Sequence, residues 1–269
     1  MQVDAHQHVW QVARGDYHWM SPGLPIARDH GLDDLRPLLG KVTATVLVQA
    51  AQTAAETDFL LAVAHGSAGL VRGVVGWVDL AAEDAPAQVQ ARAGDKLLKG
   101  LRPMLQDIDD TLWILRPSVQ PGLAAMAACG LRLDLLIKPH HLPEIGELAG
   151  RHPLLAVVVD HAAKPDIEGG GFQPWADWIK RLADETGWYC KLSGLVTEAG
   201  AEWDAARLRP YVDHLMACFG PARLMWGSDW PVVDLAGGYV RWRAAAEALV
   251  PDEARAAVFG GTAARFYGL

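Results

Sequence analysis

The sequence has few cysteines, no excess of basic residues and no long apolar run. Its three cysteines, Cys129, Cys190 and Cys218, are odd in number and widely spaced, which favours free thiols over a disulfide frame or a zinc knuckle. With 24 Lys and Arg against 32 Asp and Glu, the net charge of −8 argues against a nucleic-acid partner. No apolar run is long enough to cross a membrane, and no signal-peptide pattern opens the chain. We therefore expect a cytoplasmic protein with no nucleic-acid or membrane partner.

A Gly-rich phosphate loop is also absent after the first apolar segment, so no nucleotide cofactor is implied. What is present is a regular alternation of apolar strands and helical segments over 269 residues, 51% of them hydrophobic. A (β/α)8 barrel typically needs about 250 residues. The pattern therefore predicts an α/β fold, a (β/α)8 TIM barrel formed by one domain, residues 1–269. We expect its strands at residues 3–8, 44–50, 71–78, 100–106, 131–137, 154–161, 189–193 and 224–229.

The first predicted strand carries two histidines, His6 and His8, separated by one residue. Side chains alternate along a strand, so both imidazoles would lie on one face about 7 Å apart. Such a pair can share a cation or polarise a substrate oxygen. The alternative is two exposed histidines near a frayed end of the chain.

Two further residues follow predicted strands at the end where barrel enzymes keep their chemistry. His161 follows the sixth strand and Asp229 the eighth. Together with His6 and His8 they would form a hydrolytic site, in which Asp229 is the general base and the histidines polarise a carbonyl. The alternatives are a core histidine bonded to a backbone carbonyl and an aspartate that caps a helix.

Other polar and aromatic residues are expected at the same rim as substrate-binding groups. The amide and guanidinium groups would bond to substrate oxygens, although Arg102 could instead pair with a structural acid. Tryptophans at a pocket mouth can stack on sugar faces, although their usual role is to fill the core. Asp4 and Asp160 are expected to orient imidazoles. Residues 11–30 are expected to form a loop that covers the site, with a loop that only closes one end of the barrel as the alternative. The predicted substrate-binding residues are Gln49, Gln106, Arg102, Trp10, Trp113 and Trp230.

The segments DAHQHVW, VVVDHAAKP, KLSGL and WGSDWPV resemble those of the amidohydrolase superfamily, and more narrowly its sugar-lactonase branch, the relatives of L-fuconolactone and L-rhamnonolactone hydrolases. The resemblance extends from His6 to about Phe266. It implies hydrolysis of a sugar-acid lactone to the aldonate. It also implies that any bound metal is held by His6, His8, His161 and Asp229.

Two departures from the superfamily pattern limit the metal content. The fourth strand offers no Lys or Glu to bridge two metals, and His140, near the end of the fifth strand, lies past a proline. We therefore expect at most one divalent ion, zinc before others, and catalysis without a metal stays open.

Alternatives on the same scaffold are a dicarboxylate-lactone hydrolase and a metal-dependent decarboxylase. A dicarboxylate would require several cations at the rim, where we expect only Arg102 and at most Lys138. We therefore expect neutral aldonolactones to be the preferred small-molecule substrates. A catalytically silent barrel acting as a binding protein is the alternative from another class, and a homo-oligomer is compatible with the sequence.

Overall fold

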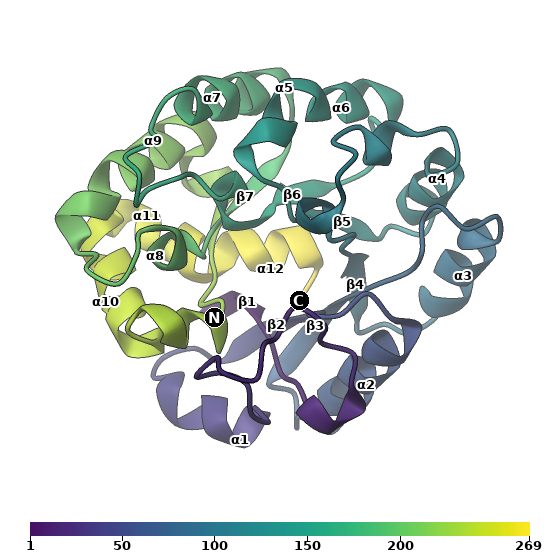
Figure 1. Ribbon diagram of the computed structural model, residues 1–269, viewed down its shortest axis with the longest axis horizontal. Coiled ribbons are helices and arrows are strands. Elements are labelled where there is room, and N and C mark those ends of the chain that lie inside the picture. The colour runs from purple at the N-terminus through teal and green to yellow at the C-terminus, as the bar shows by residue number, and fades with distance from the viewer.

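The computed structural model describes residues 1–269 and has the predicted (β/α)8 barrel (Figure 1). Its eight parallel strands neighbour one another in chain order. The ring is closed where the backbone N–H of Asp229 donates to the carbonyl of His6 at 2.8 Å and that of His8 to the carbonyl of Trp230 at 2.7 Å. The strands are β1 (Val3–Gln7), β2 (Ala44–Val48), β3 (Val71–Gly76), β4 (Leu98–Leu101), β5 (Arg132–Leu135), β6 (Val157–Val159), β7 (Tyr189–Leu192) and β8 (Leu224–Trp226).

Helices surround the strands, and two of them begin at side-chain caps. Thr53 accepts a hydrogen bond from the backbone of Glu56 at the start of α2, and Asp204 accepts one from Arg207 at the start of α9, which satisfies N–H groups that the helix itself leaves unpaired. None of the helices is both long and apolar enough to cross a membrane. They are α1 (Leu32–Leu35), α2 (Ala54–His65), α3 (Ala85–Arg92), α4 (Gln120–Ala128), α5 (Leu142–Ile145), α6 (Glu147–Arg151), α7 (Trp175–Glu185), α8 (Leu195–Glu198), α9 (Ala205–Arg223), α10 (Tyr239–Leu249), α11 (Asp252–Ala256) and α12 (Thr262–Tyr267).

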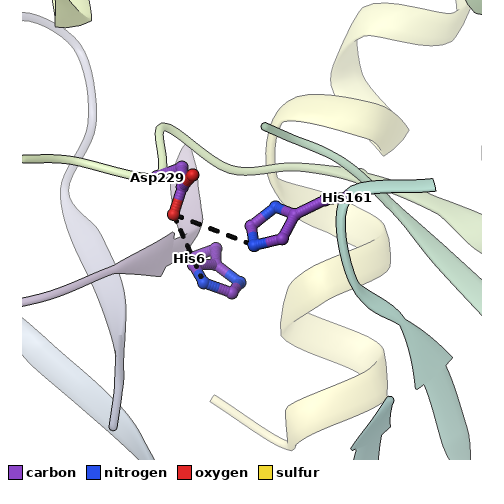
Figure 2. Close-up of side chains that lie close together, drawn as sticks. All are labelled: His6, His161 and Asp229. Atoms are coloured by element: carbon purple, nitrogen blue, oxygen red, sulfur yellow. Dashed lines mark ion pairs between the residues drawn. The ribbon is translucent and has the colours of Figure 1, made fainter. Parts of the chain in front are cut away.

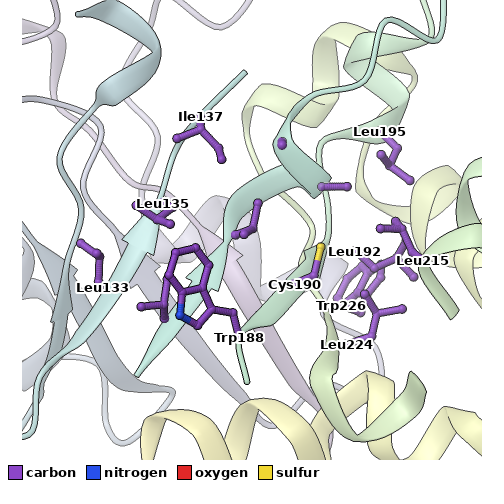
Figure 3. Packing of buried hydrophobic residues seen from close by; sticks show 14 of the residues in the cluster. Leu133, Leu135, Ile137, Trp188, Cys190, Leu192, Leu195, Leu215, Leu224 and Trp226 are labelled. Atoms are coloured by element: carbon purple, nitrogen blue, oxygen red, sulfur yellow. The ribbon is translucent and has the colours of Figure 1, made fainter. Parts of the chain in front are cut away.

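Alternation along the strands divides the core into two layers. Leu133 and Leu135 of β5 belong to the large apolar cluster between strands and helices, as do Cys190 and Leu192 of β7 (Figure 3). The residues between them therefore face the barrel interior. A second cluster fills that interior and includes side chains of α12, the yellow helix that crosses the barrel in Figure 1. Its members are Val3, Ala5, Ala44, Val46, Val48, Val75, Val158, Met225, Ala263, Phe266 and Tyr267.

All eight strands end earlier than predicted, and the fourth and sixth differ most. The fourth strand ends at Leu101 rather than at residue 106, because Pro103 has no N–H to donate to a ladder. The sixth covers only Val157–Val159, since Leu154 lies in a turn with 88% of its side chain exposed.

Two of the helical segments are interrupted. The short 3-10 turn Trp113–Leu115 precedes α4, which begins at Gln120, and the segment after β5 is two short helices, α5 and α6, that meet at Gly146.

Candidate active site

Three histidines surround one carboxylate at the C-terminal end of the barrel. Figure 2 shows two of them, His6 and His161, with the carboxylate of Asp229. Oδ1 of Asp229 lies 3.2 Å from Nε2 of His8, 3.6 Å from Nε2 of His6 and 3.8 Å from Nε2 of His161. All four side chains are at most 7% exposed. The four residues predicted to carry the chemistry are thus brought together from β1, β6 and β8.

Unusual backbone conformations deliver two of these side chains. Asp229 follows β8 with a φ of 60°, and His161 follows β6 with a φ of 52°. A positive φ is uncommon for non-glycine residues and is concentrated at functional sites. The ring of His161 is held by a 2.8 Å hydrogen bond between its Nδ1 and Oγ of Ser193. Gly194 lies against it, and a Cβ there would be 2.6 Å from Nδ1 of His161.

Fixed partners assign the protons on two of the imidazoles. Nδ1 of His8 lies 2.7 Å from the carbonyl oxygen of Val48 and must donate to it, which in the neutral ring leaves the lone pair on Nε2. Nδ1 of His6 lies 3.1 Å from the ammonium nitrogen of Lys191 and accepts from it, which leaves a proton on Nε2 of His6. That proton lies between two acceptors, Nε2 of His8 at 3.2 Å and Oδ1 of Asp229.

The same place between these acceptors suits a divalent cation. Ligand atoms of His6, His161 and Asp229 lie within 4.8 Å of one another. Zinc binds imidazole nitrogen and carboxylate oxygen at about 2.0–2.2 Å, which puts tetrahedral ligands about 3.3 Å apart. The observed separations from Asp229, 3.6 and 3.8 Å, are close to that value. The donor set therefore fits a single metal, bound in exchange for the proton on His6.

Lys191, which contacts His6 from inside the barrel, is fully buried. It was not predicted from the sequence as part of the site. Its ammonium nitrogen lies 2.5 Å from Asp134 and 3.0 Å from Asp160 in addition to His6. The hydroxyl of Tyr267 donates to Asp134 at 2.7 Å. A signal was present in the sequence, because Asp134 and Lys191 interrupt apolar strands at positions that alternation directs into the barrel. A charge at such a position is rarely left without a partner.

The charged neighbours of the two buried acids, Asp160 and Asp134, move their pKa values apart. Burial would raise the pKa of Asp160, but Lys191, His6 and Arg102 outweigh it and hold that pKa well below its usual value. Burial raises the pKa of Asp134 to about 6 against the opposing effect of Lys191.

Asp229 and His161 are set for base chemistry at neutral pH. Burial would raise the pKa of Asp229, but the neighbouring imidazoles outweigh it, so that its pKa lies below the ordinary value. Burial lowers the pKa of His161 to about 4. The carboxylate is therefore ionised and the His161 imidazole neutral above about pH 4.

Arg102, immediately after β4, bridges the histidines and the buried acids. Its Nη1 lies 3.2 Å from Oδ2 of Asp160 and 3.3 Å from Nε2 of His6, and its Nη2 donates to the carbonyl of Gln49. The structural pairing considered for Arg102 is thus present, with Asp160 as the partner. Arg102 nevertheless lines the cavity described next.

A cavity of about 170 Å³ opens above the cluster. Trp10, Arg102 and Gln106 line it, as predicted for substrate-binding residues. Trp19, in the loop between β1 and α1, was not predicted; its Nε1 donates to the carbonyl of Ala50 at 2.8 Å, which ties this loop to the cavity wall. The complete lining is His8, Trp10, Trp19, Ala50, Arg102, Met104, Gln106, Leu136, His161, Lys164, Asp229 and Val232.

Three predicted substrate-binding residues do not line this cavity. Gln49 is fully buried and donates to the carbonyl of Arg102 at 2.7 Å, so its amide is used within the barrel rim. Trp230 is 1% exposed and packs edge-on against His30 in the core. Trp113 lies in a 3-10 turn and packs against the apolar cluster. Two tryptophans thus have the core-filling role that was the alternative for them.

Three further polar residues, Asp4, Lys138 and His141, do not contribute to the site. Asp4 does not orient an imidazole, because Oδ1 accepts from the backbone N–H groups of Ser228 at 2.8 Å and His6 at 3.2 Å. Lys138 and His141 contact each other beside β5 and do not line the cavity.

Comparison with known proteins agrees with this geometry. The family model described as amidohydrolase matches residues 3–269. An L-fucono-1,5-lactonase of Burkholderia ambifaria is 47% identical over 98% of this chain and 94% of its own length. An L-fucono-1,5-lactonase of Burkholderia multivorans is 36% identical over 100% of this chain and 96% of its own.

A solved structure gives the same result. An amidohydrolase of Burkholderia multivorans, crystallised with bound zinc, is 36% identical and superposes with a TM-score of 0.93, covering 100% of this chain and 99% of that one. The chain belongs to the amidohydrolase family, as its motifs predicted.

Proposed function

We propose that the protein hydrolyses a neutral sugar-acid lactone to the open aldonate. The observation that carries this is an ionised carboxylate, Asp229, surrounded by three imidazoles at the base of a cavity large enough for one sugar ring. Two relatives that match the whole chain are named for hydrolysis of L-fucono-1,5-lactone. Lactone hydrolysis needs a base for water and donors for the carbonyl oxygen, and the site offers both.

The reaction proceeds in two steps on these residues. Asp229 takes a proton from water while the water oxygen attacks the lactone carbonyl carbon. The guanidinium of Arg102 is a donor for the oxygen that becomes negative, and in the metal-free site the proton on Nε2 of His6 is a second one. The bond from this carbon to the ring oxygen then breaks, and Asp229 returns its proton to the ring oxygen, which becomes the free hydroxyl. The imidazoles of His8 and His161 flank Asp229 and the attacking water.

A single zinc ion is the cofactor we propose for the site, held by His6, His161 and Asp229 with His8 beside them. When bound, it supplies Lewis-acid polarisation of the substrate carbonyl. His161 and His8 have their second nitrogens bonded to Ser193 and Val48, the arrangement that orients imidazole ligands in metal sites.

The charge of the cavity favours a neutral substrate over a dicarboxylate. Only Arg102 and Lys164 among the lining residues are cationic. Arg102 is paired with Asp160 at 3.2 Å, and Lys164 lies 3.8 Å from Glu198. Trp19, which is 40% exposed, provides the aromatic surface on which the apolar face of a sugar can stack, and the buried Trp10 packs edge-on against it. The dicarboxylate-lactone alternative would leave at least one carboxylate without a free cation.

A panel of aldonolactones tests the proposal directly. A pH indicator follows acid release, with and without a chelator, and lactones that carry extra carboxylates serve as the comparison class. We expect kcat/KM for neutral five- or six-membered aldonolactones to be well above that for carboxylated lactones. A clear preference for the carboxylated class would overturn the sugar-lactone assignment and leave the hydrolase in place.

On the same footing we propose a cytoplasmic location, which is supported by the three unpaired cysteines. We also propose that the protein acts on its small-molecule substrate without a nucleic-acid or membrane partner.

A further inference from the structure

The segment after β6 forms a left-handed turn that neither the fold nor the general-base chemistry explains fully. His161, Ala162, Ala163 and Lys164 have φ values of 52°, 50°, 59° and 52°. The left-handed conformation is costly for every residue but glycine, and runs of it are avoided. A single positive φ would suffice to turn His161 toward Asp229, so the continuation of the turn to Lys164 needs another reason.

Neighbouring groups hold this turn in place. The backbone N–H of Lys164 donates to the carbonyl of His161 at 2.8 Å, and Nε1 of Trp175 donates to the carbonyl of Ala162 at 2.7 Å. Ala162 and Ala163 are fully buried. In a turn closed by a bond between residues three apart, the first and fourth side chains lie above one another. His161 and Lys164 accordingly line the same cavity.

Lys164 differs from the other cation of the cavity in that its charged group makes no hydrogen bond within the protein. The guanidinium of Arg102 is bonded to Asp160 and to the carbonyl of Gln49. The ammonium nitrogen of Lys164 lies 3.8 Å from Oε1 of Glu198, beyond hydrogen-bond distance, and makes no other polar contact. Its side chain is 24% exposed. It is therefore held at the cavity wall by the turn and by a loose ion pair.

We propose that Lys164 is a substrate-binding residue that donates a hydrogen bond to a ring hydroxyl of the lactone and thereby selects hydroxylated rings. This rests on the proposed lactonase function. The left-handed turn positions two groups at once, His161 beside the reacting carbon and Lys164 beside the ring substituents. Glu198 keeps the ammonium directed at the cavity between turnovers, and its net neutralisation of Lys164 agrees with an uncharged substrate.

The test compares two substrates, a hydroxylated aldonolactone and δ-valerolactone, a six-membered lactone with no hydroxyl group. For Lys164→Met we expect kcat/KM on the aldonolactone to fall about 10- to 100-fold, mostly through KM, as for the loss of a hydrogen bond to a charged donor. On δ-valerolactone, measured at high enzyme concentration, we expect a change below about threefold. Lys164→Arg should recover part of the loss because it restores donors at the same place.

Lys138→Met is the matched control, since Lys138 also follows a strand but does not line the cavity. Its kcat/KM on the aldonolactone and on δ-valerolactone should both stay near the wild-type values. An equal loss on the two substrates in Lys164→Met would mean that the lysine only supports the turn, and no loss on either would mean that it does not touch substrate. Both results overturn the proposal. Failure of the wild-type protein on every lactone would instead overturn the proposed function.

Discussion

Substitution of Gly194 by alanine separates the cost of a left-handed backbone from the cost of displacing His161. Gly194 has a φ of +66°, and an added Cβ would lie 2.6 Å from Nδ1 and 2.7 Å from Cγ of the His161 ring. The backbone conformation alone costs alanine roughly 1–2 kcal/mol. Overpacking of a buried site adds about 1–3 kcal/mol. We therefore expect Gly194→Ala to lower the free energy of unfolding by about 2–5 kcal/mol.

The control is Gly130→Ala, because Gly130 has nearly the same φ as Gly194 without the contact. Gly130 has a φ of +68° after α4, and its Cβ would meet nothing within 4 Å. Its cost should be only the backbone part, about 1–2 kcal/mol. In a chain of this size each kcal/mol lowers Tm by roughly 2 °C. Thermal and urea unfolding of both variants, measured side by side, give the difference due to the contact.

The two variants should also differ in activity. A ring moved by about 1 Å costs on the order of 100-fold in rate, so we expect that loss in kcat/KM for Gly194→Ala and less than about twofold for Gly130→Ala. Equal stability losses in the two variants, with full activity in Gly194→Ala, would refute the idea that Gly194 holds the His161 ring.

Four other measurements test the site. Asp229→Asn should lower turnover by at least about 100-fold, the scale of a positioned general base, and near-native activity would exclude that role. Because the pKa of His161 lies at about 4, its imidazole becomes protonated as the pH falls through that value; kcat/KM should be level from about pH 6 to 8 and decrease near pH 4, and a decrease centred near 6.5 would contradict this. Lys191→Met removes the cation between Asp134 and Asp160 and should destabilise the fold by about 3–5 kcal/mol in urea unfolding; a smaller loss than 1 kcal/mol would show that the acids are neutral. Elemental analysis should find at most one divalent ion per chain, and two tightly held ions would require a second site.

Residues at the C-terminal ends of strands, within the strand or just after it, were the most predictable part of the site. His6 and His8 lie on one face because strand alternation requires it, and their rings are 4.9 Å apart between centroids. Asp229 reaches them because the C-terminal ends of parallel strands meet at one rim. For these residues the position in the chain determines the position in space.

Side-chain direction beyond the strand was not predictable in the same way. Gln49 and Trp230 also follow strands, yet Gln49 bonds to the rim backbone and Trp230 packs into the core. Each lies in a connection whose conformation depends on distant contacts: Gln49 faces Arg102 after β4, and Trp230 packs against His30. The sequence around Gln49 and Trp230 does not indicate these partners. Of the three tryptophans predicted at the site only Trp10 lines the cavity, together with Trp19, which was not predicted.

His161 shows most clearly where local rules stop. Its motif predicts a strand followed by a histidine, and both are present, but the four consecutive left-handed residues contradict the preference of each of them. Only tertiary contacts can hold such a turn. These are the hydrogen bond from Trp175, the burial of both alanines, and the space that Gly194 leaves for the His161 ring because it has no Cβ. The same contacts that made the turn unpredictable bring Lys164 to the cavity. Strain maintained by so many partners is expected at functional sites. Here the strained turn places His161, the partner of the base Asp229, and Lys164, the proposed hydrogen-bond donor to the substrate, three residues apart on one wall of the cavity.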